Sequence, residues 1–212
     1  KPEKTDPRGT IVHEMMHEFV GGIEGPEGLI AWFQEGLTVF YSNLLPLRAG
    51  LGTVDEYLAG INEEAKSYYE NPGKNMSAEA IVKVGFGDER IRHVPYARGF
   101  LYFADLDAKI REASGGKRKL DNVVLELFAR RKAGEKIDQE KWLEAVTKEI
   151  GPSARTQFEA VNLRGETIVP VSGAFGPGFE RKAVKYSLDG KELEGFEWTR
   201  VPSVPDSVCR EW

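Results

Sequence analysis

The sequence predicts a mainly α-helical protein, α+β overall, in which a helical part is followed by a small β-rich segment at the C-terminal end. Capping residues and proline or glycine stops divide residues 1–150 into helices. After Gly165 the pattern changes to short runs of β-branched and aromatic residues between glycines and prolines. The composition, 41% hydrophobic and 30% charged over 212 residues, is that of an ordinary globular chain. We therefore expect two parts, residues 1–150 and residues 151–212.

The expected helices follow from these signals in chain order. Asp6 and Pro7 form an N-cap and first-turn pair, and the helix that they open should end at Gly21 and Gly22. Thr53 and Glu56 form a capping box for the third helix. The second helix is expected at residues 29–45, closed by Pro46, and the third runs from Thr53 to about residues 71–73. Residues 74–94 should form a long loop with one short helix. Four more helices are expected at residues 95–113, 121–132, 138–150 and 153–162. The β-type runs are residues 167–171, 181–188 and 196–201.

Charge and composition exclude several function classes as first choices. The net charge is −5 and no run of basic residues stands out, which argues against nucleic acid or an anionic membrane as partner. Uncharged stretches such as residues 36–47 are too short to span a bilayer. The single cysteine allows no internal disulfide and leaves the compartment open. Because the chain starts at Lys1 with no visible signal peptide, we expect a piece of a longer protein. The sequence leaves the location unknown and is compatible with secretion or a periplasmic location.

The first expected helix contains the pattern H-E-x-x-H, from His13 to His17. Spacing of four residues puts both imidazoles on one face of a helix, where they can bind the same ion. Zinc accepts such nitrogen ligands, and a catalytic zinc site needs a third protein ligand and an open position for water. Glu14 adjoins the first ligand and can accept a proton from that water.

Glu35 is the candidate for the third ligand. A thermolysin-like arrangement takes this ligand from a second helix that reverses against the first, and the glycine-rich loop at 21–28 permits the reversal. Gly36 has no side chain, so the two helices can approach closely. Glu24 and Glu27 are rival carboxylates, but their place in the loop favours a solvated role.

Simpler interpretations stand beside the zinc site. H-E-x-x-H can occur by chance, and Met15, Met16 and Phe19 are compatible with an ordinary core helix. Against this, two of the only three histidines in the chain have ligand spacing. Glu18 is either solvent-facing or a partner of the ligand side chains.

Several motifs, taken together and in order, resemble the glycyl aminopeptidase family of gluzincin zinc metallopeptidases, in its catalytic C-terminal part. They lie within residues 11–150 and are, beyond H-E-x-x-H, Trp32-Phe33-Gln34-Glu35-Gly36-Leu37-Thr38, residues 47–51, residues 55–58, Tyr96-Ala97-Arg98-Gly99-Phe100-Leu101, Asp107, Ile110-Arg111, residues 115–117 and residues 120–123.

This resemblance implies zinc-dependent hydrolysis of peptide bonds on a thermolysin-like helical scaffold. It carries over His13, His17 and Glu35 as zinc ligands and Glu14 as the general base. It also implies that Tyr96 donates a hydrogen bond to the oxyanion of the tetrahedral intermediate, a role that stabilises developing negative charge.

Four further residues are candidates for contacts with the ligand side chains or with a peptide substrate: Glu18, Thr38, His93 and Arg98. Arg98 could bind a substrate carboxylate, but pairing with an acidic residue is the favoured interpretation. His93 precedes Tyr96 by three residues, although an isolated loop histidine is more often solvent-exposed.

The chain also departs from the family. Family members normally have a β-rich domain and a strand before the zinc helix, and this sequence starts too close to His13 to include them. The edge that would pair with an extended substrate is therefore not found in this sequence before His13. The interval between His17 and Glu35 is also short for close relatives. Two alternatives therefore remain: a non-catalytic fragment or scaffold that retains the fold, and a zinc hydrolase acting on a non-peptide bond. Residue preference, exo- or endo-action and oligomeric state are not predicted.

Overall fold

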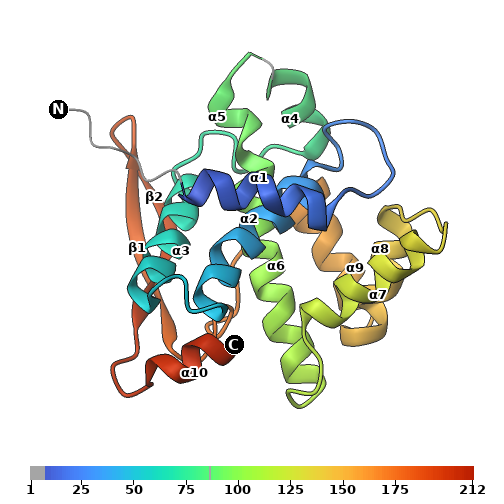
Figure 1. Ribbon diagram of the computed structural model, residues 1–212. Coiled ribbons are helices and arrows are strands. Elements are labelled where there is room, and N and C mark those ends of the chain that lie inside the picture. The colour runs from blue at the N-terminus through green and yellow to red at the C-terminus, as the bar shows by residue number, and fades with distance from the viewer. Residues whose placement is uncertain (1–7, 86) are drawn as a thin grey trace.

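The computed structural model describes residues 8–85 and 87–212, and it is mainly α-helical with one two-stranded sheet (Figure 1). The predicted N-terminal features at Lys1, Asp6 and Pro7 lie outside the described residues. The helices of the first part are α1 (Arg8–Val20), α2 (Ala31–Arg48), α3 (Val54–Tyr69), α4 (Ala78–Gly85), α5 (Glu89–Arg92) and α6 (Val94–Ala113). They are followed by α7 (Leu120–Lys132), α8 (Gln139–Ile150), α9 (Ser153–Phe158), a π-helical turn η1 (Glu159–Leu163), β1 (Phe179–Leu188), β2 (Lys191–Arg200) and α10 (Asp206–Glu211).

Helix α6 is the central element, and Figure 1 shows it running through the middle of the molecule between the hairpin and α7–α9. Fifteen of its twenty residues are buried. It crosses α2 where Gly36 meets Gly99, so closely that a Cβ on Gly36 would lie 2.5 Å from the Gly99 Cα. Next to this crossing, the Trp32 and Phe158 rings pack with centroids 4.6 Å apart. The two glycines thus allow the backbones of α2 and α6 to touch.

The strands β1 and β2 form an antiparallel hairpin that pairs Phe179 with Arg200 and Leu188 with Lys191. Its turn has two residues with positive φ, Asp189 (50°) and Gly190 (78°), as a tight two-residue hairpin connection requires. The hairpin packs on α3, where the Asn62 side chain bonds to both the backbone N–H and the carbonyl of Trp198. Trp198 is buried in the main core, together with the aromatic residues of α6.

Several predicted boundaries are confirmed, and the capping box at Thr53 is present with both of its hydrogen bonds. The predicted end of the second helix at Leu45 was wrong, because α2 continues through Pro46 to Arg48. Proline lacks the N–H of one helical hydrogen bond, but here it lies in the last turn, where buried Leu44 and Leu47 hold the chain against the core.

Residues 167–171 form no strand, in contrast to the prediction. Their backbone groups bond to side chains instead of to a neighbouring strand: Ile168 N–H donates to the Tyr68 hydroxyl at 3.1 Å, and Val171 N–H donates to Asp105 Oδ1 at 2.7 Å. Pro170 has no backbone N–H and so cannot donate a hydrogen bond to a neighbouring strand. Residues 74–94 hold two short helices, α4 and α5, where one was expected, and α10 was not predicted.

No helix in the described residues is both long and apolar enough to cross a membrane.

Candidate zinc site

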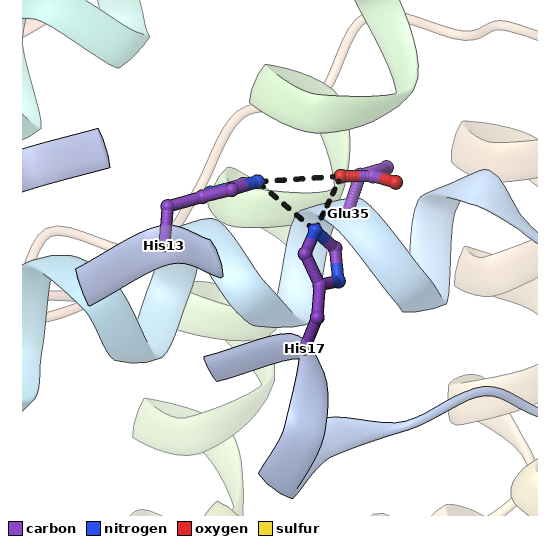
Figure 2. Close-up of side chains that lie close together, drawn as sticks. All are labelled: His13, His17 and Glu35. Carbon is purple, nitrogen blue, oxygen red and sulfur yellow. Dashed lines mark hydrogen bonds and ion pairs between the residues drawn. The ribbon is translucent and has the colours of Figure 1, made fainter. Parts of the chain in front are cut away.

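The two histidines of H-E-x-x-H lie one helical turn apart on α1 and face the same point (Figure 2). The Nε2 atoms of His13 and His17 are 3.2 Å apart, and their rings meet edge to face with centroids at 4.8 Å. The rings are partly buried, with side-chain exposures of 21% for His13 and 30% for His17. The helix thus presents two nitrogen atoms together at the protein surface.

Glu35 on α2 completes a triangle of ligand atoms. Its Oε2 lies 3.4 Å from His13 Nε2 and 3.3 Å from His17 Nε2 (Figure 2). Four-coordinate zinc with bonds of about 2.0–2.1 Å separates its ligand atoms by about 3.3 Å. The three edges of 3.2, 3.3 and 3.4 Å therefore have the dimensions of one face of a tetrahedral zinc site. The donor set of two imidazoles and one carboxylate also suits zinc.

The α1–α2 loop brings these two helices together. Gly21 has a positive φ of 57°, which ends α1. Arg131 of α7 then donates to the carbonyl of Gly22 at 2.7 Å and holds the loop. The rival carboxylates Glu24 and Glu27 are exposed in this loop, and neither joins the triangle.

Thr38 lies one turn beyond Glu35 on α2 and contacts His17 from the side opposite the triangle. Its hydroxyl oxygen is 3.3 Å from His17 Nδ1, and the residue is fully buried. This contact favours the tautomer in which Nδ1 carries the proton and donates it to Thr38. The lone pair of Nε2 then points to the triangle, as a metal ligand requires.

The charges at the triangle shift the pKa of Glu35 downward. Burial raises the pKa of this carboxyl, but the hydrogen bond with His13 and the charges of His17 and His13 outweigh it. The carboxylate is therefore ionised at neutral pH, which is the form that binds a metal.

Tyr96, from the first turn of α6, reaches the same point. Its ring lies parallel to that of His13, with centroids 6.3 Å apart. Burial, followed by the charge of Glu35, raises the pKa of Tyr96 to about 12. The phenol therefore keeps its proton at neutral pH and can act as a hydrogen-bond donor.

Two further candidates, Glu14 and His93, act on Tyr96. Glu14 is exposed on α1, and its charge contributes to the raised pKa of Tyr96. The His93 ring, at the junction of α5 and α6, meets Tyr96 edge to face with centroids at 5.1 Å. Glu18 is exposed and does not join the triangle.

Arg98 is buried and turns away from the triangle. Its guanidinium donates to the carbonyls of Lys74 at 3.0 Å and Met76 at 2.8 Å. The expected acidic partner is thus replaced by backbone carbonyls, which fixes the segment that leads into α4.

One carboxyl near the site was not found by sequence reasoning. Burial, followed by repulsion from Glu63, raises the pKa of Glu64 on α3 to about 7, while the charge of His13 acts in the opposite direction. Glu64 therefore lies within electrostatic range of His13. Nothing in its local sequence distinguishes it from the other acidic residues of α3, since only the packing of α3 brings it there.

Comparison with known proteins confirms the resemblance that the motifs indicated. Residues 7–84 match the M61 glycyl aminopeptidase family, a stretch that includes His13, His17 and Glu35 and stops before Tyr96. Curated protein sequences gave no significant match.

The fold is similar to a crystal structure of an aminopeptidase N family protein from Idiomarina loihiensis. The TM-score is 0.67 at 18% sequence identity, over 86% of this chain. The chain spans 36% of the length of that structure. The similarity therefore concerns the fold of one part of a larger protein.

Proposed function

We propose that this chain, which is similar to the M61 glycyl aminopeptidases, is the catalytic part of a zinc-dependent, aminopeptidase-like peptidase of the gluzincin class. The observation that carries the proposal is the triangle of His13, His17 and Glu35, whose edges fit tetrahedral zinc. A peptide is the proposed substrate. The proposed arrangement is thermolysin-like, with H-E-x-x-H on α1 and the third ligand on α2. In this proposal residues 1–150 form the catalytic part and residues 151–212 an appended segment.

When bound, zinc supplies a polarised water and a positive charge for the substrate carbonyl. In this proposal Glu14 accepts the proton of the attacking water and later delivers it to the nitrogen of the leaving amine. Its position on α1, next to His13 and within electrostatic range of Tyr96, supports this role. Tyr96 donates its hydroxyl proton in a hydrogen bond to the oxygen on which negative charge develops. Thr38 keeps the His17 ring oriented.

A non-catalytic scaffold that retains the metal is the second candidate. It is favoured by one observation, namely that the chain spans only about a third of the similar structure. The two candidates share the zinc site and differ in turnover, so two measurements separate them.

The first measurement is the zinc content of the purified, zinc-loaded chain by elemental analysis. We expect about one zinc per chain, and its loss in His17→Ala. The matched control is His93→Ala, which changes the only histidine outside the triangle and should retain the metal. Absence of zinc from the folded wild-type chain would contradict the site.

The second measurement is peptide hydrolysis by the zinc-loaded chain and by Glu14→Gln. We expect the variant to bind zinc and to lose turnover, while Glu24→Gln, a carboxylate exposed in the loop, retains it. Turnover retained in Glu14→Gln would remove the base assignment. If the wild-type chain binds zinc but hydrolyses no peptide, the scaffold is the favoured candidate.

A further inference from the structure

A pocket of about 340 Å³ opens directly beside the candidate zinc site. It shares Glu35 and Tyr96 with that site, and it extends from them toward α4 and the start of α2. This volume lies at the lower end of the range for ligand sites, which fits one amino-acid side chain with the adjoining peptide atoms. Figure 1 shows α4 and α5 together at one end of the molecule, above α1 and α2.

Apolar and small residues make up the far part of the pocket. Ile81 and Val82 of α4 form one wall, and Ala31 of α2 and Pro95 of α6 form others. Ile81 is 4% exposed and belongs to a small hydrophobic cluster with Ile91 and Val94, separate from the main core. This cluster holds α4 in place as a wall of the pocket.

Val82 lies where the two sides of the pocket meet. A Cβ on Gly28 would be 2.9 Å from Val82 Cγ2, and Gly28 has a positive φ of 81° that suits glycine. The α1–α2 loop and α4 therefore touch at Val82. A change in the size of this side chain alters the depth of the pocket directly.

The charged residues of the pocket do not favour a charged ligand. One of them, Glu35, is taken up by the candidate zinc site. The other two, Glu27 and Arg92, are both exposed and have opposite signs, and Arg92 already pairs with Glu89 at 3.4 Å. Gln34, near Glu35, is uncharged. The buried part of the lining thus consists of apolar groups. Contact with an apolar side chain would remove apolar surface on both sides from water, which is favourable.

We propose that this pocket binds an apolar side chain of the peptide residue next to the scissile bond, and that Val82 sets the size of the side chain accepted. The inference rests on the proposed peptidase function, because it takes the triangle as the place of cleavage. It adds the substrate class: peptides with a medium-sized apolar residue, such as leucine or methionine, at one side of the bond cleaved.

The test compares the zinc-loaded wild-type chain with Val82→Ala and Val82→Phe. A panel of peptides varies the residue on each side of the scissile bond through glycine, alanine, leucine and phenylalanine, with products identified by mass spectrometry. At one of the two positions, Val82→Ala should shift the ratio of kcat/KM for phenylalanine over alanine upward by about 10-fold, and Val82→Phe should shift it downward by a similar factor. The matched controls are Val84→Ala and Val84→Phe, on the same helix but 44% exposed and outside the pocket, which should leave the ratio unchanged.

A binding measurement separates this inference from the proposed function. Hydroxamates bind zinc directly, so two series that carry a hydrogen, methyl, isobutyl or benzyl group on either side of the hydroxamate can be titrated by calorimetry without turnover. If the wild-type chain hydrolyses no peptide but the Val82 variants shift the hydroxamate preference, the pocket is supported and the peptidase function fails. If peptides are hydrolysed but both readouts are the same in the Val82 and Val84 variants, the pocket assignment is overturned and the function stands. Equal affinity of all hydroxamates for the wild-type chain also overturns it.

Discussion

Helices α1 and α6 contribute to the same candidate site, yet the protein holds them in very different ways. Helix α6 carries Tyr96 and is buried over fifteen of its twenty residues. Helix α1 carries His13 and His17 but exposes three large apolar side chains, Ile11 at 54%, Met15 at 56% and Phe19 at 66%. They follow one another at intervals of four residues and thus form one stripe on the outer face of α1.

This difference separates the framework of the site from its metal ligands. The main attachment of α1 is its contact with α2 through a face that includes buried Met16 and Val20. In contrast, α2 and α6 touch backbone to backbone at Gly36 and Gly99. A metal bound by the triangle would join α1 to α2 by ligand bonds as well as by packing. Substitutions on the two helices should therefore affect stability, metal binding and catalysis to different degrees.

The largest effect is expected at the crossing of α2 and α6. A Cβ on Gly99 would lie 2.5 Å from the Trp32 carbonyl oxygen and 2.7 Å from the Gly36 Cα, both backbone atoms that cannot move separately from their helices. Gly99→Ala should therefore lower the free energy of unfolding by about 3 kcal/mol or more, measured by urea denaturation.

The same substitution on α1 should act with the opposite sign. Gly9 is exposed in α1, and a Cβ there would meet nothing within 4 Å. Gly9→Ala should raise the free energy of unfolding by about 0.5–1 kcal/mol through helix propensity alone. Equal effects of the two substitutions would contradict the difference between the helices.

The hydroxyl of Tyr96 tests whether the buried helix contributes to the chemistry. Tyr96→Phe should lower kcat by about 100-fold, the scale of one lost oxyanion donor, with little change in KM or zinc content. Steady-state kinetics of the zinc-loaded chain measure this. Tyr186→Phe is the control, because the Tyr186 hydroxyl donates to the Phe196 carbonyl within the hairpin and should not affect kcat. An unchanged kcat in Tyr96→Phe would remove Tyr96 from the mechanism.

Thr38 tests how α2 orients a ligand of α1. Thr38→Val keeps the shape of this buried side chain but removes the oxygen that faces His17 Nδ1 at 3.3 Å. Zinc affinity should fall by about 10-fold, the lower end of what such ligand partners contribute. Competition with a zinc chelator measures the affinity. Thr38→Ser, which retains a hydroxyl, should lose much less, and equal losses would show that packing rather than the hydrogen bond matters.

The sequence predicts the parts of this molecule that depend on local spacing. H-E-x-x-H requires only that residues 13–17 form a helix. Gly36 indicates a close helix approach, but the expected partner helix was wrong, because Gly36 meets α6 and not α1. The partner in that approach, Gly99, lies 63 positions further on and has no local signal of its own. The charge of His13 likewise acts on Glu64 only because of the packing of α3.

Tertiary contacts also explain where local patterns were misleading. Residues 167–171 have strand-like composition, but their hydrogen bonds go to Tyr68 and Asp105, which are distant in sequence. Pro46 is a helix stop in isolation, whereas here packing of the last turn of α2 outweighs the loss of one hydrogen bond. The pocket beside the site is formed by three separate segments, so no single motif could indicate it.

The smallest effect is expected on the outer face of α1. Because Phe19 is 66% exposed, Phe19→Ser should change the free energy of unfolding of this chain by less than about 0.5 kcal/mol. Met16→Ala, on the buried face of the same helix, should cost about 2 kcal/mol, the lower end of the range for a buried methionine. Urea denaturation of both variants measures the contrast. If Phe19→Ser lowers the free energy of unfolding by more than about 1 kcal/mol, the outer stripe of α1 is covered in solution. The inference that α1 is attached mainly through its contact with α2 would then be wrong.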